Sequence, residues 1–148
     1  MSYTSLFCHI VFSTKDRRAF LTDELMPRLV EYVSGIAREL KGQVLEAGGA
    51  PDHLHLAAAL HPTAAVAGFV GKIKAGSSGW IHKTFPDLGV FSWQDGYAAF
   101  SVSPSILPKV KAYIREQAEH HRKLSFREEL VALLERHGIG YDERHILA

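Results

Sequence analysis

Two histidines in the segment Pro51-Asp52-His53-Leu54-His55-Leu56 are spaced for metal chemistry. In a strand, the side-chain period of two places His53 and His55 on one face and the leucines on the other. Their β-carbons would then lie roughly 6 to 7 Å apart, at which both imidazoles can bind one divalent ion. The alternative is the polar outer face of a half-buried strand, and this motif alone does not decide between the two.

A second set of candidate residues follows in the segment 107–118, where apolar residues recur at helical spacing. Gln117 falls beside this apolar stripe. Burying an amide without a partner costs about 1 to 3 kcal/mol, so Gln117 should have a specific partner, and a metal ion or its water shell would serve. Tyr113 precedes it by one helical turn on the same side. A tyrosine on a helix is usually a packing residue, so Tyr113 by itself does not indicate a nucleophile.

Composition restricts the class of protein. The 148 residues, 47% hydrophobic and 22% charged, predict one compact soluble domain over residues 1–148. The N-terminus does not resemble a secretory signal, and no run approaches the ~18 apolar residues that span a bilayer. We therefore expect a cytoplasmic protein with no membrane partner. The single cysteine, Cys8, excludes an internal disulfide and a thiolate-rich zinc cluster.

The first half of the chain predicts a strand, a helix and a hairpin. Residues 3–14 are apolar and rich in β-branched and aromatic side chains, which favours a buried strand. Thr22 can cap a helix that continues to Gly42. Residues 43–47 and 52–60 predict two paired strands, with a turn at 48–51.

The second half predicts a helix over 62–85, a strand over 97–103 and a helix over 106–123. Ser125 and Glu128 form a capping box for a last helix that ends at Gly138. The order of elements predicts an α+β fold of the ferredoxin-like sandwich type. In this fold, a mainly antiparallel sheet has helices packed on it.

Several motifs in this order resemble the single-tyrosine transposases of the HUH superfamily, which include the insertion-sequence and REP-associated tyrosine transposases. They are the His-hydrophobe-His strand, the Tyr-Ile-x-x-Gln helix, and the segments HIVFSTKDRR, GGAPDHLHL, IKAGSS, WQDGYAAFSVS and YIREQAEHHRKLSF. The resemblance implies that His53, His55 and Gln117 bind the metal and that Tyr113 is the nucleophile. It also implies Mg²⁺ or Mn²⁺ as cofactor and a single-stranded DNA hairpin from an insertion-sequence end as substrate. It further implies a homodimer in which the tyrosine helix of one subunit completes the histidine site of the other.

This chemistry suits the residue types. A metal bound to a phosphodiester neutralises the charge that repels a nucleophile. Attack by Tyr113 would leave a 5′-phosphotyrosine and a free 3′-hydroxyl, and a later attack on that bond would rejoin DNA without ATP. Histidine ligation favours Mn²⁺ over Mg²⁺, which prefers oxygen ligands.

Binding of single-stranded DNA needs cations along the backbone and aromatic faces for the bases. The net charge is only +1, so these cations must form local patches. Trp80, Trp93 and Tyr97 are candidate stacking residues, and His120 and His121 either support the metal ligands or are plain surface residues. The cations predicted to contact DNA are Lys15, Arg17, Arg18, Lys72, Lys74, Arg115, Arg122 and Lys123. Each one taken singly also fits an ordinary solvated charge.

Other functions remain open at this point. A replication initiator or conjugative relaxase would use the same histidines and tyrosine, although such chains tend to be longer. A domesticated relative would act on repeated genomic hairpins. A non-catalytic nucleic-acid-binding module of ferredoxin-like fold would keep the basic loops but would have no need of Tyr113 and Gln117.

Overall fold

The computed structural model describes residues 1–117 and 123–146. Its centre is one four-stranded antiparallel sheet in the order β2-β3-β1-β4, formed by β1 (Phe7–Ser13), β2 (Gln43–Ala50), β3 (His53–Ala59) and β4 (Ala98–Val102). The helices are α1 (Leu25–Glu39), α2 (Val66–Thr84), α3 (Leu107–Arg115) and α5 (Phe126–Arg136), with short 3₁₀ turns at Lys15–Arg17 and Pro86–Leu88. The predicted α+β, ferredoxin-like arrangement is confirmed.

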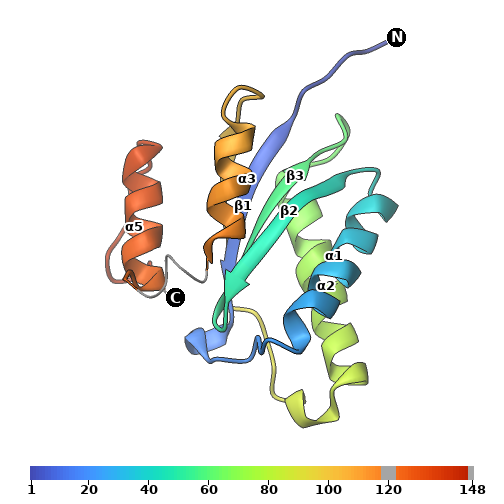
Figure 1. Cartoon of the computed structure of the whole chain (residues 1–148), viewed down its shortest axis with the longest axis vertical. Helices are drawn as coiled ribbons and strands as arrows, with labels where there is room; N and C mark the ends of the chain where they lie inside the picture. The colour runs from blue at the N-terminus through green and yellow to red at the C-terminus, as the bar shows by residue number, and fades with distance from the viewer. Residues whose placement is uncertain (118–122, 147–148) are drawn as a thin grey trace.

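The two faces of the sheet carry different helices. Helices α1 and α2 cover one face, whereas α3 and α5 lie over the other (Figure 1). Because side chains alternate along a strand, Ile10, Leu54 and Leu56 enter the larger core beneath α1 and α2. Val11 and Phe100 instead pack with α5 in a smaller core. None of the described helices is long and apolar enough to cross a membrane.

The predicted first two helices are confirmed, although both are shorter than expected. The hydroxyl of Thr22 accepts a hydrogen bond from the Leu25 amide at 3.1 Å, and α1 begins at Leu25. Lys41, with a φ of 63°, follows the helix and precedes Gly42. α2 is continuous despite its glycines because Phe69, Ile73 and Ile81 bury one side of it. This burial outweighs the low helix propensity of glycine.

The turn predicted at 48–51 is wrong at its first three positions. β2 continues through Gly48 and Gly49 to Ala50, and the chain reverses at Pro51 and Asp52. Both glycines permit a close approach of backbones. A β-carbon at Gly48 would overlap the backbone oxygen of Ile114 in α3, and one at Gly49 would overlap that of His53. Gly48 therefore lets α3 lie close against the sheet, and Gly49 lets β2 lie close to the start of β3.

The helix predicted over 106–123 is confirmed from Leu107 to Arg115, but it does not run unbroken through Glu116. α3 ends at Arg115, and Glu116 caps it with φ −96° and ψ 19°, outside the helical region. Residues 118–122, with His120, His121 and Arg122, lie outside the described residues. The last helix is confirmed with its capping box, because the Ser125 hydroxyl accepts from the Glu128 amide at 3.1 Å and the Ser125 amide donates to the Glu128 carboxylate at 3.3 Å.

Candidate active site

The paired histidines lie side by side on β3, on the face beneath α3 and α5. Both side chains are fully buried, and their ring centroids are 5.2 Å apart. The expectation from strand periodicity, that His53 and His55 share one face, is confirmed. The ring of Phe126 from α5 stacks on His53 at 4.5 Å between centroids, so an aromatic ring covers one imidazole.

Each imidazole has a hydrogen-bonding partner at its Nδ1 nitrogen. His53 Nδ1 lies 2.7 Å from Asp52 Oδ1, and His55 Nδ1 lies 2.7 Å from His9 Nε2. Burial and the neighbouring His55 lower the pKa of His9 to about 3, so His9 is neutral. Burial also acts to lower the pKa of His53, but hydrogen bonds to Asp52 and Glu129 outweigh it and raise that pKa to about 9. These contacts direct both Nε2 atoms toward the same point.

A carboxylate occupies that point. Glu129 of α5 is 1% exposed, and its two oxygens face different partners. Oε1 lies 3.0 Å from His55 Nε2 and 3.5 Å from His53 Nε2. Oε2 accepts hydrogen bonds from Gln117 Nε2 at 3.0 Å and from the Tyr113 hydroxyl. Burial raises the pKa of this carboxyl, but hydrogen bonds from the two histidines and Tyr113 outweigh it, so the pKa is well below its usual range.

Sequence reasoning missed Glu129, although the sequence contains a signal for it. The buried residues of α5 are Phe126, Glu129 and Leu133, which recur at helical spacing. An acid on the apolar stripe of a helix is as unusual as the glutamine at position 117. The same physical argument that singled out Gln117 therefore applies to Glu129.

Gln117 and Tyr113 complete the cluster. Gln117 is 1% exposed, and its Oε1 lies 3.2 Å from His53 Nε2, so the expectation that it has a specific partner is confirmed. Tyr113 is half-buried, and its ring lies 5.9 Å from that of His55. Burial, then the hydrogen bond to Glu129 and its charge, raise the pKa of the phenol, while Gln117 and Arg136 act in the opposite direction. All of these contacts form within one chain.

The donor set fits a divalent cation. One ligand atom each from His53, His55 and Glu129 lie within 4.8 Å of one another. The Nδ1 atoms of the two imidazoles are hydrogen-bonded to Asp52 and His9. A partner at this second ring nitrogen is what orients a metal-binding histidine. The amide oxygen of Gln117 adds a fourth donor beside His53. His53, His55 and Glu129 can therefore hold a metal ion.

Some of the predicted DNA-contacting cations lie near this cluster. Lys15 and Arg17 form the 3₁₀ turn after β1, and Arg18 follows it. Ser13 at the end of β1 is paired with His53, so this basic turn lies at the histidine end of the sheet. Arg115 ends α3 and makes an ion pair with Glu46 at 3.1 Å. Lys123 is exposed before α5.

The cations of α2 lie elsewhere. Lys72 and Lys74 belong to α2, and this helix covers the face of the sheet opposite α3 and α5 (Figure 1). Lys74 donates to the backbone oxygens of Gln94 and Gly96 at 2.7 and 2.8 Å. Of the candidate stacking residues, Trp93 is buried, Trp80 stacks on Tyr32, and Tyr97 is 43% exposed.

Comparisons with known proteins show which family this chain is similar to. Residues 2–117 match the family model described as transposase IS200 like. The ISDra2 transposase TnpA of Deinococcus radiodurans is 26% identical over 114 residues, covering 74% of this chain and 81% of that protein. The transposase for insertion sequence element IS200 of Salmonella typhimurium is 28% identical over 119 residues, covering 77% and 78%.

Two solved structures share the fold. One is a crystal structure described as a transposase from Deinococcus radiodurans R1, with a TM-score of 0.65 and 26% identity, covering 78% of this chain and 93% of that chain. The other is a REP-associated tyrosine transposase bound to a REP hairpin, with a TM-score of 0.62 and 15% identity, covering 82% and 72%. The family match ends at Gln117, so α5 with Glu129 lies beyond it.

Proposed function

This chain belongs to the IS200-like transposase family, and on that basis we propose that it cleaves and rejoins single-stranded DNA at hairpin-bearing insertion-sequence ends through a 5′-phosphotyrosine intermediate. The observation that carries the proposal is the contact network of one phenol, two imidazoles, one amide and one carboxylate at a single buried point. A structure of the same fold is bound to a REP hairpin, which supports hairpin DNA as the substrate class.

The cofactor we propose is Mg²⁺ or Mn²⁺, held by His53, His55 and Glu129 with the amide oxygen of Gln117. When bound, such a cation supplies the charge neutralisation that a phosphodiester needs before an oxygen nucleophile can attack it. The mixed nitrogen and oxygen donors favour Mn²⁺, and Mg²⁺ serves where it is abundant.

Tyr113 is the proposed nucleophile. Its phenol oxygen forms a bond to phosphorus while the bond from phosphorus to the 3′-oxygen breaks, and that oxygen leaves and takes up a proton. The hydrogen bond from the phenol to Glu129 Oε2 positions the attacking oxygen, and the phenol loses its proton to water more readily when a cation is bound nearby. A later attack by a 3′-hydroxyl on the phosphotyrosine reverses these changes and rejoins DNA. The number of phosphodiester bonds is thereby conserved.

The partners we propose are single-stranded DNA hairpins and a second copy of the chain. The resemblance to single-tyrosine transposases implies that two subunits exchange their tyrosine helices. Within one chain, however, Tyr113 contacts Glu129 beside His55 of the same chain. A homodimer of two complete sites is consistent with this geometry.

The test is Tyr113→Phe, which removes the nucleophilic oxygen and keeps the ring. Wild-type protein incubated with a 3′-labelled single-stranded hairpin substrate and Mn²⁺ should form a labelled covalent adduct on a denaturing gel, because the 5′-phosphotyrosine retains the 3′ part of the strand. The variant should form none, yet should retain hairpin binding in a gel shift. Tyr141→Phe removes another hydroxyl from a tyrosine, one that donates to Glu135 on the surface, and serves as the matched control. An adduct that persists in Tyr113→Phe rules out Tyr113 as the nucleophile.

A further inference from the structure

A cleft of about 640 Å³ opens beside the nucleophile. Tyr113 and the buried His9 line it, with ring centroids 6.1 Å apart. Ile106 at the N-cap of α3, Lys109 of α3 and Arg136 of α5 line it as well. The cleft therefore reaches Tyr113 between α3 and α5.

The charge of this cleft is suited to an anion. Its described lining contains the cations Lys109 and Arg136 and no carboxylate. Both side chains are exposed. Lys109 precedes Tyr113 by one helical turn, about 5.4 Å along the axis. Arg136 also affects the phenol electrostatically, because its charge acts to lower the pKa of Tyr113.

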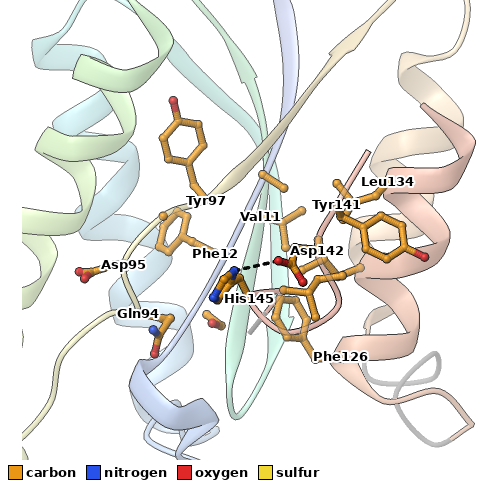
Figure 2. A pocket seen from close by; sticks show the side chains of 15 residues that line it. Val11, Phe12, Gln94, Asp95, Tyr97, Phe126, Leu134, Tyr141, Asp142 and His145 are labelled. Carbon is orange, nitrogen blue, oxygen red and sulfur yellow. Dashed lines mark ion pairs between the residues drawn. The ribbon is translucent and has the colours of Figure 1, made fainter. Parts of the chain in front are cut away.

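A second cleft, of about 300 Å³, lies near Phe126 and has the opposite character. Figure 2 shows Asp95 and Asp142 among the residues that line it, with Asp142 paired to His145 at 3.2 Å. Carboxylates repel a phosphate backbone. Of these two clefts, only the one that reaches Tyr113 is suited to DNA.

We propose that the cleft between α3, α5 and β4 binds the backbone of single-stranded DNA next to the scissile phosphate, with Lys109 and Arg136 each contacting a phosphate. This inference rests on the proposed function and specifies where its substrate lies. It assigns DNA contacts to two cations that are distinct from the basic turn at Lys15–Arg17. It also gives α5 a role in substrate binding.

The salt dependence of binding tests the proposal. The probe is a fluorescein-labelled oligothymidylate of about 20 nucleotides, longer than typical single-strand binding sites, measured by anisotropy with the full chain. Each lost phosphate contact reduces the slope of log affinity against log salt by about 0.7 on single strands. We expect Lys109→Gln and Arg136→Gln each to reduce the slope by about 0.7 and the affinity at low salt by about 3- to 10-fold, with the double variant adding the two effects.

A second variant places a negative charge in the cleft without endangering the fold. Ile106 is 45% exposed and is the N-cap of α3, where a carboxylate is favourable to the helix. Ile106→Glu should therefore weaken DNA binding while thermal stability is unchanged or higher. The matched controls lie on the other face of the sheet: Ala65→Glu, at the exposed N-cap of α2, and Arg38→Gln on α1. Both controls should bind DNA as the wild type does.

The outcomes separate this inference from the proposed function. Wild-type protein that binds and cleaves single-stranded DNA, with slope and affinity unchanged in all four cleft variants, would overturn the cleft assignment and leave the function standing. Equal losses in the controls and the cleft variants would also overturn it. Wild-type protein that neither binds nor cleaves single-stranded DNA would overturn both proposals.

Discussion

At the residue scale, the carboxylate of Glu129 divides its two oxygens between two tasks. Oε1 faces the two imidazoles and Oε2 faces the phenol and the amide of Gln117. A buried carboxylate is costly unless it is paired, and here every contact pairs it with a site residue. One side chain therefore links the proposed metal ligands to the proposed nucleophile.

Glu129→Gln should weaken metal binding. The amide keeps the shape of the side chain but is a weaker ligand and carries no negative charge, so we expect affinity for Mn²⁺ to fall by about 10- to 100-fold or more. Titration of the purified protein with Mn²⁺, followed by the electron paramagnetic resonance signal of the free ion, measures this without requiring activity.

The control for this prediction is the neighbouring residue. Glu128 is exposed, and glutamine is accepted at its position in a capping box. Glu128→Gln should therefore bind Mn²⁺ as the wild type does. Equal affinity of the Glu129→Gln and wild-type proteins for Mn²⁺ would show that this carboxylate is not a ligand.

Asp52→Asn tests the orientation of His53. The Asp52 carboxylate lies 2.7 Å from His53 Nδ1, so its loss should weaken Mn²⁺ binding by about 10- to 100-fold, as is usual for a group that orients a ligand. Calorimetric titration with Mn²⁺ measures the change. Asp87→Asn, in the distant 3₁₀ turn Pro86–Leu88, should leave the affinity unaltered. If both variants bind equally well, Asp52 does not orient the imidazole.

The sequence predicted the shared face of His53 and His55 and the need of Gln117 for a partner, because each followed from local periodicity. Glu129 and His9 could not be assigned in the same way. His9 on β1 contacts His55 on the neighbouring strand β3, and Glu129 contacts Tyr113 from a separate helix. Such contacts depend on sheet register and helix placement, which local patterns do not specify.

At the element scale, the position of α3 depends on the glycines of β2. Gly48 lies against the backbone of Ile114, which precedes Gln117 by three residues. The sequence predicted a turn here because adjacent glycines are common in turns. The close approach of α3 becomes visible only when the helix is placed on the sheet.

Gly48→Ala should displace α3 and with it Tyr113. A backbone oxygen cannot move aside cheaply, so we expect a loss of about 1 to 3 kcal/mol in the free energy of unfolding. Urea denaturation measures this loss, and covalent adduct formation should fall with it. Gly68→Ala on α2 has open space around the new methyl group and should instead stabilise the protein by about 1 kcal/mol. Similar stability of the Gly48→Ala and wild-type proteins would contradict the close contact between Gly48 and the backbone of α3.

At the scale of the whole molecule, one chain assembles all five site residues. The network joins β3, α3, α5 and Gln117 across the face of the sheet away from α1 and α2 (Figure 1). The sequence predicted the layers of this fold from the order of its elements. Local patterns could not predict whether Tyr113 lies at the histidine pair of its own chain or at that of a second copy. This depends on the path that the chain takes between its helices and strands.

Mixing two inactive variants tests whether subunits exchange α3. Tyr113→Phe lacks the nucleophile and His53→Ala lacks a ligand, so complete sites in each chain predict that their mixture forms no adduct. The adduct assay on unfolded, mixed and refolded chains measures this, with analytical ultracentrifugation to establish the assembly state. Recovered activity in the mixture would demonstrate that subunits exchange Tyr113, as the family resemblance implies.

The family match stops at Gln117, while the carboxylate that contacts Tyr113 comes from residue 129. A boundary drawn from similarity alone would cut through the proposed reaction centre. A recombinant fragment trimmed at that point would expose both imidazoles to water, and any loss of its activity would be mistaken for poor folding. Searches for related proteins should therefore test the helix downstream of the matched region for a single acidic residue on its apolar face, even where sequence similarity is no longer detectable.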